Sequence, residues 1–179
     1  MRYLLCALAL LSSPLVLADW QLDGDSSRIS FVSVKRGEMA EVMRFDRLSG
    51  QIDDKGEARI LIPMESIDSG LALRDERLRQ NFFDVAKHPQ ATISSQLDLS
   101  SFDDLQVGQS RTQQVDLNLE LNGQQRRLKA DVLVSRLDEG RVQVAMLEPL
   151  AELASLPSIT PEVPVFAVLG FRQVVTQQP

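Results

Sequence analysis

The amino-acid sequence predicts an all-β protein, on three observations. From Asp19 onward apolar and polar residues alternate with a period of two, which places successive side chains on opposite faces of a strand. Turns rich in Gly, Asp and Asn separate the alternating stretches. No run of long helices lies between them. Adjacent strands should therefore pair antiparallel, in a sandwich or an up-and-down barrel, and periodicity alone does not separate the two.

The first eighteen residues are typical of an export signal. Arg2 precedes an apolar run from Tyr3 to Leu17, and Val16 and Ala18 stand where a signal peptidase reads small side chains. Serines and a proline interrupt this run, which is shorter than the ~20 residues that span a bilayer. We predict a signal peptide over residues 1–18 and a single β domain over residues 19–179. The chain's one cysteine lies within the signal.

The alternating stretches predict nine strands in order along the domain. The clearest hairpin follows Leu117, Leu119 and Leu121, which alternate with polar residues up to the turn Asn122-Gly123. Both turn residues tolerate positive φ, as a tight hairpin requires. The expected strands lie near residues 20–23, 28–35, 42–52, 57–63, 91–99, 115–121, 128–134, 141–147 and 163–172.

Two segments break the strand pattern. Leu71, Leu78 and Phe82 follow one another at spacings of seven and four, which predicts a short helix with one apolar stripe. On its exposed face, Asp75 and Arg79 have the spacing of an ion pair. We expect this helix to cover an apolar opening of the sheet. The second segment, residues 148–164, holds four of the chain's eight prolines and predicts a crossing with a short helical core that leads to the last strand.

Composition argues against several functions. The chain has 25 acidic and 19 basic residues, a formal net charge of −6, which disfavours nucleic acids and anionic membranes as partners. The one histidine, His88, stands directly before a proline, a position typical of strand starts. It supplies neither a catalytic triad nor a metal site on its own. Adjacent carboxylates fall in turns or on the charged helix, where solvated charge is their ordinary role. We therefore expect no catalytic residue, no metal and no enzyme.

The helix and the residues after it hold the candidates for binding. Arg74 beside Asp75 forms either a structural ion pair that fixes the helix, or, like Arg77, a contact to the polar head of a ligand at the rim of the sheet. Phe82 and Phe83 are adjacent and point in different directions. One should pack in the core while the other is able to face a cavity.

At these residues the chain resembles the YceI-like family, also called polyisoprenoid-binding or lipid-binding periplasmic proteins. The order and spacing of several short motifs carry the resemblance. They are Trp20-Gln21-Leu22-Asp23, Ser27-Arg28-Ile29-Ser30-Phe31, Phe45 with Leu48-Ser49-Gly50, Ser66-Ile67-Asp68-Ser69-Gly70, Arg74-Asp75 with Leu78-Arg79, Phe82-Phe83-Asp84-Val85, and His88-Pro89.

The resemblance implies a lipocalin-like antiparallel β-barrel of about eight strands with one or two short helices. It implies a YceI-like lipid-binding domain over residues 19–179 and a periplasmic location. The lumen would hold a long-chain amphiphile such as an isoprenoid or isoprenoid quinone, with no other cofactor and without stable membrane insertion. Relatives are often homodimers. The ligand-binding candidates are Phe31, Phe45, Phe82 and Phe83 along the lumen and Arg74 and Arg77 at the rim.

Two features differ from many relatives of this family. Arg36 and Arg77 stand where those relatives carry histidines, so no histidine-dependent role transfers to this chain. The proline-rich crossing replaces an Arg-Ser-Asp-Phe-Gly-like run near the C-terminus. A second function stays open beside the carrier: a periplasmic structural or interaction protein whose barrel is filled by its own side chains.

Overall fold

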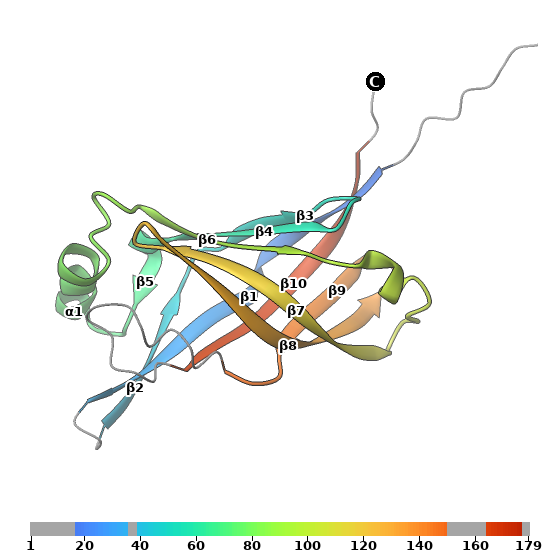
Figure 1. Ribbon diagram of the computed structural model, residues 1–179. Coiled ribbons are helices and arrows are strands. Elements are labelled where there is room, and N and C mark those ends of the chain that lie inside the picture. The colour runs from blue at the N-terminus through green and yellow to red at the C-terminus, as the bar shows by residue number, and fades with distance from the viewer. Residues whose placement is uncertain (1–16, 36–38, 150–163, 177–179) are drawn as a thin grey trace, which may run out of the picture.

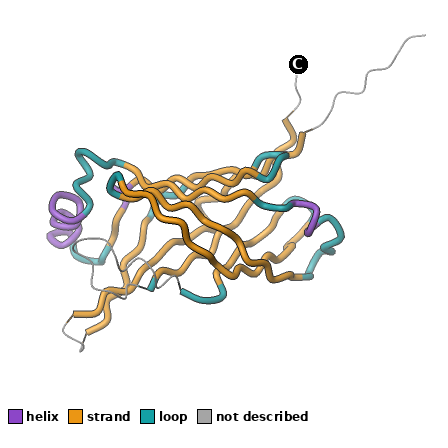
Figure 2. Tube along the Cα trace, in the orientation of Figure 1, coloured by secondary structure: helices purple, strands orange, loops and turns teal. Residues whose placement is uncertain are grey.

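Eight strands of the chain close into an antiparallel barrel (Figures 1 and 2). The computed structural model describes residues 17–35, 39–149 and 164–176. The strands in this part of the chain are β1 (Leu17–Lys35), β2 (Met39–Phe45), β3 (Ser49–Ile52), β4 (Glu57–Pro63), β5 (Ile67–Asp68), β6 (Gln90–Gln96), β7 (Ser110–Leu121), β8 (Gln124–Asp138), β9 (Arg141–Met146) and β10 (Val165–Thr176).

The pairing between β1 and β10 closes the barrel. The ring runs β1-β10-β9-β8-β7-β6-β4-β3 and returns to β1, while β2 and β5 extend from the far half of β1. The choice between sandwich and barrel is thereby decided, and the expected fold class is confirmed.

Strand β1 is longer than expected because a bulge joins the two predicted strands 20–23 and 28–35. Its register against β10 shifts between Asp23 and Arg28. Gly170 of β10 lies opposite this bulge, where an added Cβ would stand 2.1 Å from the Ser26 Oγ atom. A side chain at position 170 would therefore collide with the bulge.

The predicted strand over residues 42–52 is wrong, because the segment forms two strands, β2 and β3. Between them the amide of Asp46 donates to the Ser66 carbonyl at 2.9 Å instead of continuing a ladder. The predicted hairpin is confirmed. Asn122 and Gly123 have φ values of 51° and 71°, and Leu121 pairs with Gln124 across a two-residue turn.

The predicted helix exists as α1 (Ala72–Arg77), continued by a π-helical turn, η2 (Leu78–Phe82). Leu78 and Phe82 pack against the core, whereas Leu71 is 59% exposed and does not belong to the expected apolar stripe. The expected exposed pair of Asp75 with Arg79 is also wrong, because Asp75 is buried and binds Ser69. Arg79 instead donates to the backbone carbonyls of Glu65 and Ile67.

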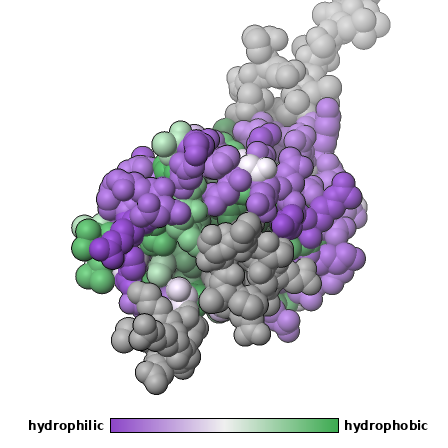
Figure 3. All heavy atoms as spheres, turned by 60° about the vertical axis from the view of Figure 1, so that its left-hand side comes forward, coloured by the Kyte–Doolittle hydropathy of each residue, from purple (hydrophilic) through white to green (hydrophobic). Residues whose placement is uncertain are grey.

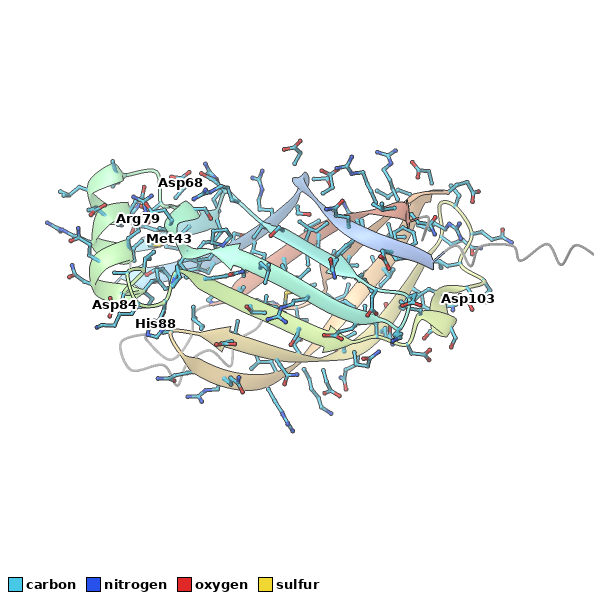
Figure 4. The ribbon with its side chains drawn as sticks, turned by 90° about the horizontal axis from the view of Figure 1, so that it is seen from above. Met43, Asp68, Arg79, Asp84, His88 and Asp103 are labelled. Carbon is cyan, nitrogen blue, oxygen red and sulfur yellow. The ribbon has the colours of Figure 1, made fainter. Side chains whose placement is uncertain are left out.

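The barrel has two distinct ends. At the first, called the α1 end, lie α1, η2, the short 3-10 turn η1 (Met64–Ser66) and strand β5 (Figure 1). At the other, the η3 end, the 3-10 helix η3 (Leu99–Phe102) precedes β7. Figure 4 labels Asp68, Arg79, Asp84 and His88 at the α1 end and Asp103 at the η3 end. The predicted crossing over residues 150–163 and most of the predicted signal lie outside the described residues.

Candidate functional site: the barrel interior

The strand alternation decides which side chains face the barrel interior. On β7 the odd-numbered residues from Val115 to Leu121 are buried or half-buried, and the even-numbered ones are exposed. Residues that pair across neighbouring strands point to the same side of the sheet. Val115 opposes Ala130 on β8, and Val134 opposes Val144 on β9. Leu169 of β10 in turn opposes Val144. The interior wall of β7 to β10 is thus mainly aliphatic.

One side of the interior is fully packed and is called the packed half here. Its residues come mostly from β1 to β5 and η1, joined by three residues from other segments, and all are at most 9% exposed. The packed half comprises Leu22, Ile29, Met43, Phe45, Ile52, Ala58, Ile60, Ile62, Met64, Ile67, Phe83, Ala91 and Phe171.

The opposite side of the interior is covered incompletely and is called the open half here. Apart from a small buried cluster of Val115, Leu128, Ala130 and Val132 on β7 and β8, its apolar side chains face inward yet remain half-buried, although the core of a filled barrel would bury them. They come from β6 to β10 and comprise Ile93, Leu117, Leu119, Leu121, Val134, Val142, Val144, Met146, Val165, Ala167 and Leu169. An inward apolar surface of this kind offers contact to a hydrocarbon chain.

The four phenylalanines named from the sequence form one chain of ring contacts at the α1 end. The ring centroids of Phe31 and Phe45 lie 6.0 Å apart, those of Phe45 and Phe83 6.1 Å, and those of Phe82 and Phe83 4.7 Å. The last two pairs meet edge to face, a favourable aromatic geometry. Phe45 and Phe83 are buried, while Phe31 and Phe82 are half-buried. The cluster therefore closes the packed half beneath η2, with two rings partly accessible.

Arg74 lies in a polar network that fixes α1 to the barrel. Its Nε donates to the Ser69 Oγ at 2.8 Å, its guanidinium also donates to the Ser69 carbonyl, and it forms an ion pair with Glu41 of β2. Asp75, 7% exposed, accepts from the Ser69 amide at 2.8 Å and from the Ser69 hydroxyl. Of the two interpretations of Arg74, these contacts favour the structural ion pair.

The rim at the α1 end is apolar as well as charged. Leu71 and Leu73 are 59% and 69% exposed, and Val42 of β2 is 67% exposed. Figure 3 shows hydrophobic residues at the surface of this end. Arg77 is exposed on α1 and does not join the network of Arg74. His88 lies against the turn, since a Cβ at Gly123 would stand 3.0 Å from its Cε1 atom.

Two arginines on the inward faces of β7 and β8 lie at the η3 end. Arg111 binds Asp104 through two hydrogen bonds of 2.9 and 3.1 Å, which lower the pKa of the Asp104 carboxyl below its usual value. Arg136 donates to the Leu105 carbonyl at 3.0 Å and to Glu139 at 3.1 Å. Both guanidinium groups therefore already have acceptors.

Sequence reasoning missed two amide side chains, Gln113 and Asn122, whose oxygen atoms are buried. Within the part of the chain that the structure describes, the buried Gln113 Oε1 and the buried Asn122 Oδ1 have no hydrogen-bond partner, although the Asn122 Nδ2 donates to the Phe82 carbonyl at 3.2 Å. The strand period already places Gln113 on the same face as Val115. An amide next to the aliphatic run from Val115 to Leu121 was thus a signal that the sequence contained.

Among residues 17–35, 39–149 and 164–176, no group of three or more His, Cys, Asp and Glu side chains is placed to hold a metal ion. In the same ranges no helix combines the length and apolar character needed to cross a bilayer.

A closed eight-stranded antiparallel barrel with an aliphatic interior and a short helix at one end defines a lipocalin-like protein. The YceI-like domain family matches residues 20–156, and the chain belongs to this family. Among curated proteins no match was found.

Solved structures agree with this assignment. A polyisoprenoid binding domain from Saccharophagus degradans, implicated in plant cell wall breakdown, is 32% identical with a TM-score of 0.79, and the match covers 87% of this chain and 98% of that one. BcnA from Burkholderia cenocepacia is 20% identical with a TM-score of 0.60 over 87% and 99% of the two chains. The YceI protein of Campylobacter jejuni is 14% identical with a TM-score of 0.56 over 82% and 91%. The last two support the fold alone.

Proposed function

We propose that the protein binds a long-chain amphiphile, such as an isoprenoid or isoprenoid quinone, with the hydrocarbon chain inside the barrel along the open half. The observation that carries this proposal is the set of inward apolar side chains of β6 to β10 that remain half-buried. The similarity to a polyisoprenoid binding domain supports the same ligand class.

The energetics favour a hydrocarbon over water along this wall. Each methylene that leaves water for an apolar environment contributes about 0.8 kcal/mol. A chain of several isoprene units would therefore bind with useful affinity after the loss of its own freedom is subtracted. The aliphatic side chains on the open half suit contact with such a chain, in keeping with a binding protein.

We further propose that the protein is exported to the periplasm and carries or stores its ligand there. The predicted signal over residues 1–18 supports export, and the domain over residues 19–179 would then be the mature protein. Leu17 and Ala18 stand at the start of β1, opposite Thr176 and Val175. Cleavage after Ala18 would shorten β1 by two residues and leave the pairing from Asp19 onward.

The second candidate function, a barrel filled by its own side chains that acts by binding a partner protein, is favoured by the packed half and by the small buried cluster of Val115, Ala130 and Val132. The half-buried wall opposite argues against it, because a filled barrel would bury both halves equally.

Native mass spectrometry of the protein purified under mild conditions from its own cells tests the proposal. We expect an added mass of one lipid per barrel, identified after solvent extraction as a chain with isoprene or comparable apolar units. Repeated recovery of empty protein that also takes up no added isoprenoid would reject the lipid-binding function.

A further inference from the structure

Gln113 is a neutral hydrogen-bonding group set into the aliphatic wall of the barrel. It faces inward near the start of β7, where Val132 of β8 opposes it in register and Val115 follows on the same face. Its Oε1 is buried and has no hydrogen-bond partner among the described residues. An unpaired buried amide oxygen is costly, so this atom is placed where a bound molecule would supply the missing partner.

We propose that Gln113 anchors the head group of the bound amphiphile, and that this head is neutral and carries a hydroxyl, carbonyl or amide. This inference rests on the proposed function and deepens it. A glutamine amide both donates and accepts, so it matches such groups in either orientation.

The charges near Gln113 argue for a neutral head. Arg111, two residues away on the same inner face, is held by both oxygens of Asp104. Arg136 at the same end is held by Glu139 and the Leu105 carbonyl. A phosphate or pyrophosphate entering here would have to displace carboxylates from both arginines, whereas a hydroxyl or carbonyl leaves these pairs intact.

The track beyond Gln113 is suited to the tail. Val115, Leu117, Leu119 and Leu121 continue the inward face of β7 toward the α1 end. At about 3.4 Å per residue, the eight steps from residue 113 to residue 121 span roughly 27 Å of this wall. The head would therefore lie at the η3 end, with the tail directed toward the phenylalanine cluster.

Two adjacent glutamines provide a matched test. Gln113→Leu keeps the approximate size of the inward side chain and removes its hydrogen bonding. Gln114→Leu changes the neighbour that faces outward, where it donates to Asp131 at 3.2 Å. The probes are geranylgeraniol, geranylgeranyl diphosphate and phytane, a branched hydrocarbon of equal length without a head group. Each competes with a fluorescent polyene for the protein.

We expect wild type to bind geranylgeraniol more tightly than phytane and at least as tightly as the diphosphate. Gln113→Leu should weaken geranylgeraniol binding roughly five- to tenfold and leave phytane binding unchanged, whereas Gln114→Leu should change neither. Without ligand, Gln113→Leu should unfold at the same or a higher temperature than wild type, because it removes an unpaired buried acceptor.

Several results would overturn the inference. Equal wild-type affinity for alcohol and phytane, tightest binding of the diphosphate, or equal losses for alcohol and phytane in Gln113→Leu would each reject the head-group role and leave the lipid-binding function standing. A lower unfolding temperature with unchanged probe selectivity would show a structural amide instead. Failure of wild type to bind any of the three probes would reject the proposed function itself.

Discussion

At the scale of single residues, buried polar groups divide into those with complete partners and those without. Asp75 belongs to the first kind, since the Ser69 amide and hydroxyl both donate to it and Ser69 also accepts from Arg74. Gln113 belongs to the second kind. A complete network fixes structure, and an incomplete one in an apolar wall points to a ligand.

Replacing Asp75 by alanine should therefore destabilise the protein strongly. The change leaves the Ser69 donors unpaired in a buried position and removes the carboxylate that organises the start of α1. We expect the free energy of unfolding in urea to fall by about 2–4 kcal/mol.

Asp54→Ala is the matched control for this prediction. Asp54 is exposed in the turn between β3 and β4, so its removal should change the free energy of unfolding by less than about 0.5 kcal/mol. Equal effects of the two substitutions would show that the Ser69 network contributes nothing specific.

At the scale of elements, the turn between β3 and β4 fixes the position of Leu97, the residue that directly follows β6. Gly56 has a φ of +82° and accepts from the Leu97 amide at 2.8 Å, and an added Cβ would lie 2.1 Å from the Leu97 carbonyl oxygen. Gly108 has nearly the same φ, +83°, with open space around it. Substitutions at these two glycines therefore separate the energetic cost of backbone strain from the cost of steric crowding.

Gly108→Ala should lower the free energy of unfolding by roughly 1–2 kcal/mol, the cost of a left-handed conformation in an alanine. Gly56→Ala should lower the free energy of unfolding by about 3 kcal/mol or more, since the backbone at Leu97 must also move. Thermal and urea unfolding measure both values. A smaller loss at Gly56 than at Gly108 would contradict the close approach of the two segments.

The contact of the η3 segment with β7 should depend on pH. Hydrogen bonds and charge attraction from Arg111 lower the pKa of Asp104 in the folded state, so this pair stabilises the fold above the ordinary aspartate pKa of about 3.9. Its contribution is lost as pH falls through the lowered folded-state pKa. Wild type should exceed Asp104→Asn in unfolding free energy at neutral pH, and the difference should vanish in strong acid.

Asp103→Asn controls for the change of net charge, because Asp103 is exposed beside Asp104 and has no ion pair among the described residues. A difference between wild type and Asp104→Asn that persists unchanged into strong acid would contradict the ion pair with Arg111.

Comparison of these elements with the sequence shows what local patterns determine. Period-two alternation located the β7–β8 hairpin, because the inward faces next to the turn are aliphatic from Val115 to Leu121 on β7 and from Leu128 to Val134 on β8. It missed the break between β2 and β3, since the amide of Asp46 is satisfied by Ser66, about twenty residues away in sequence. The role of Asp75 was missed for a different reason: its partner Ser69 lies in the turn between β5 and α1, and neither the helical nor the strand period links these two positions.

At the scale of the whole molecule, the barrel interior has two unequal halves. Ile60 in the packed half is 4% exposed, whereas inward residues of the open half such as Val134 and Val144 are half-buried. Chain closure by β1 and β10 determines the size of the interior, and the choice of side chains determines which half is filled. We infer that this asymmetry leaves space for the ligand.

Enlarging a side chain should have opposite consequences in the two halves. Ile60→Phe overpacks a filled region and should lower the free energy of unfolding by about 1–3 kcal/mol. Val134→Phe should change it by less than about 1 kcal/mol and weaken isoprenoid binding instead. Leu133→Phe, on the outward face of the same strand, controls for the added ring. A loss of stability in Val134→Phe equal to that in Ile60→Phe would contradict the open half.

The position of the ligand is tested most directly by the methionine methyl groups. Met146 lies in the open half, whereas Met43 and Met64, 4% and 1% exposed, lie in the packed half. With methyl-labelled methionine, addition of geranylgeraniol should shift the Met146 resonance and produce contacts between its methyl and the isoprenoid chain, while Met64 stays unchanged. Saturating binding that leaves Met146 unaffected would contradict a hydrocarbon chain held along this wall.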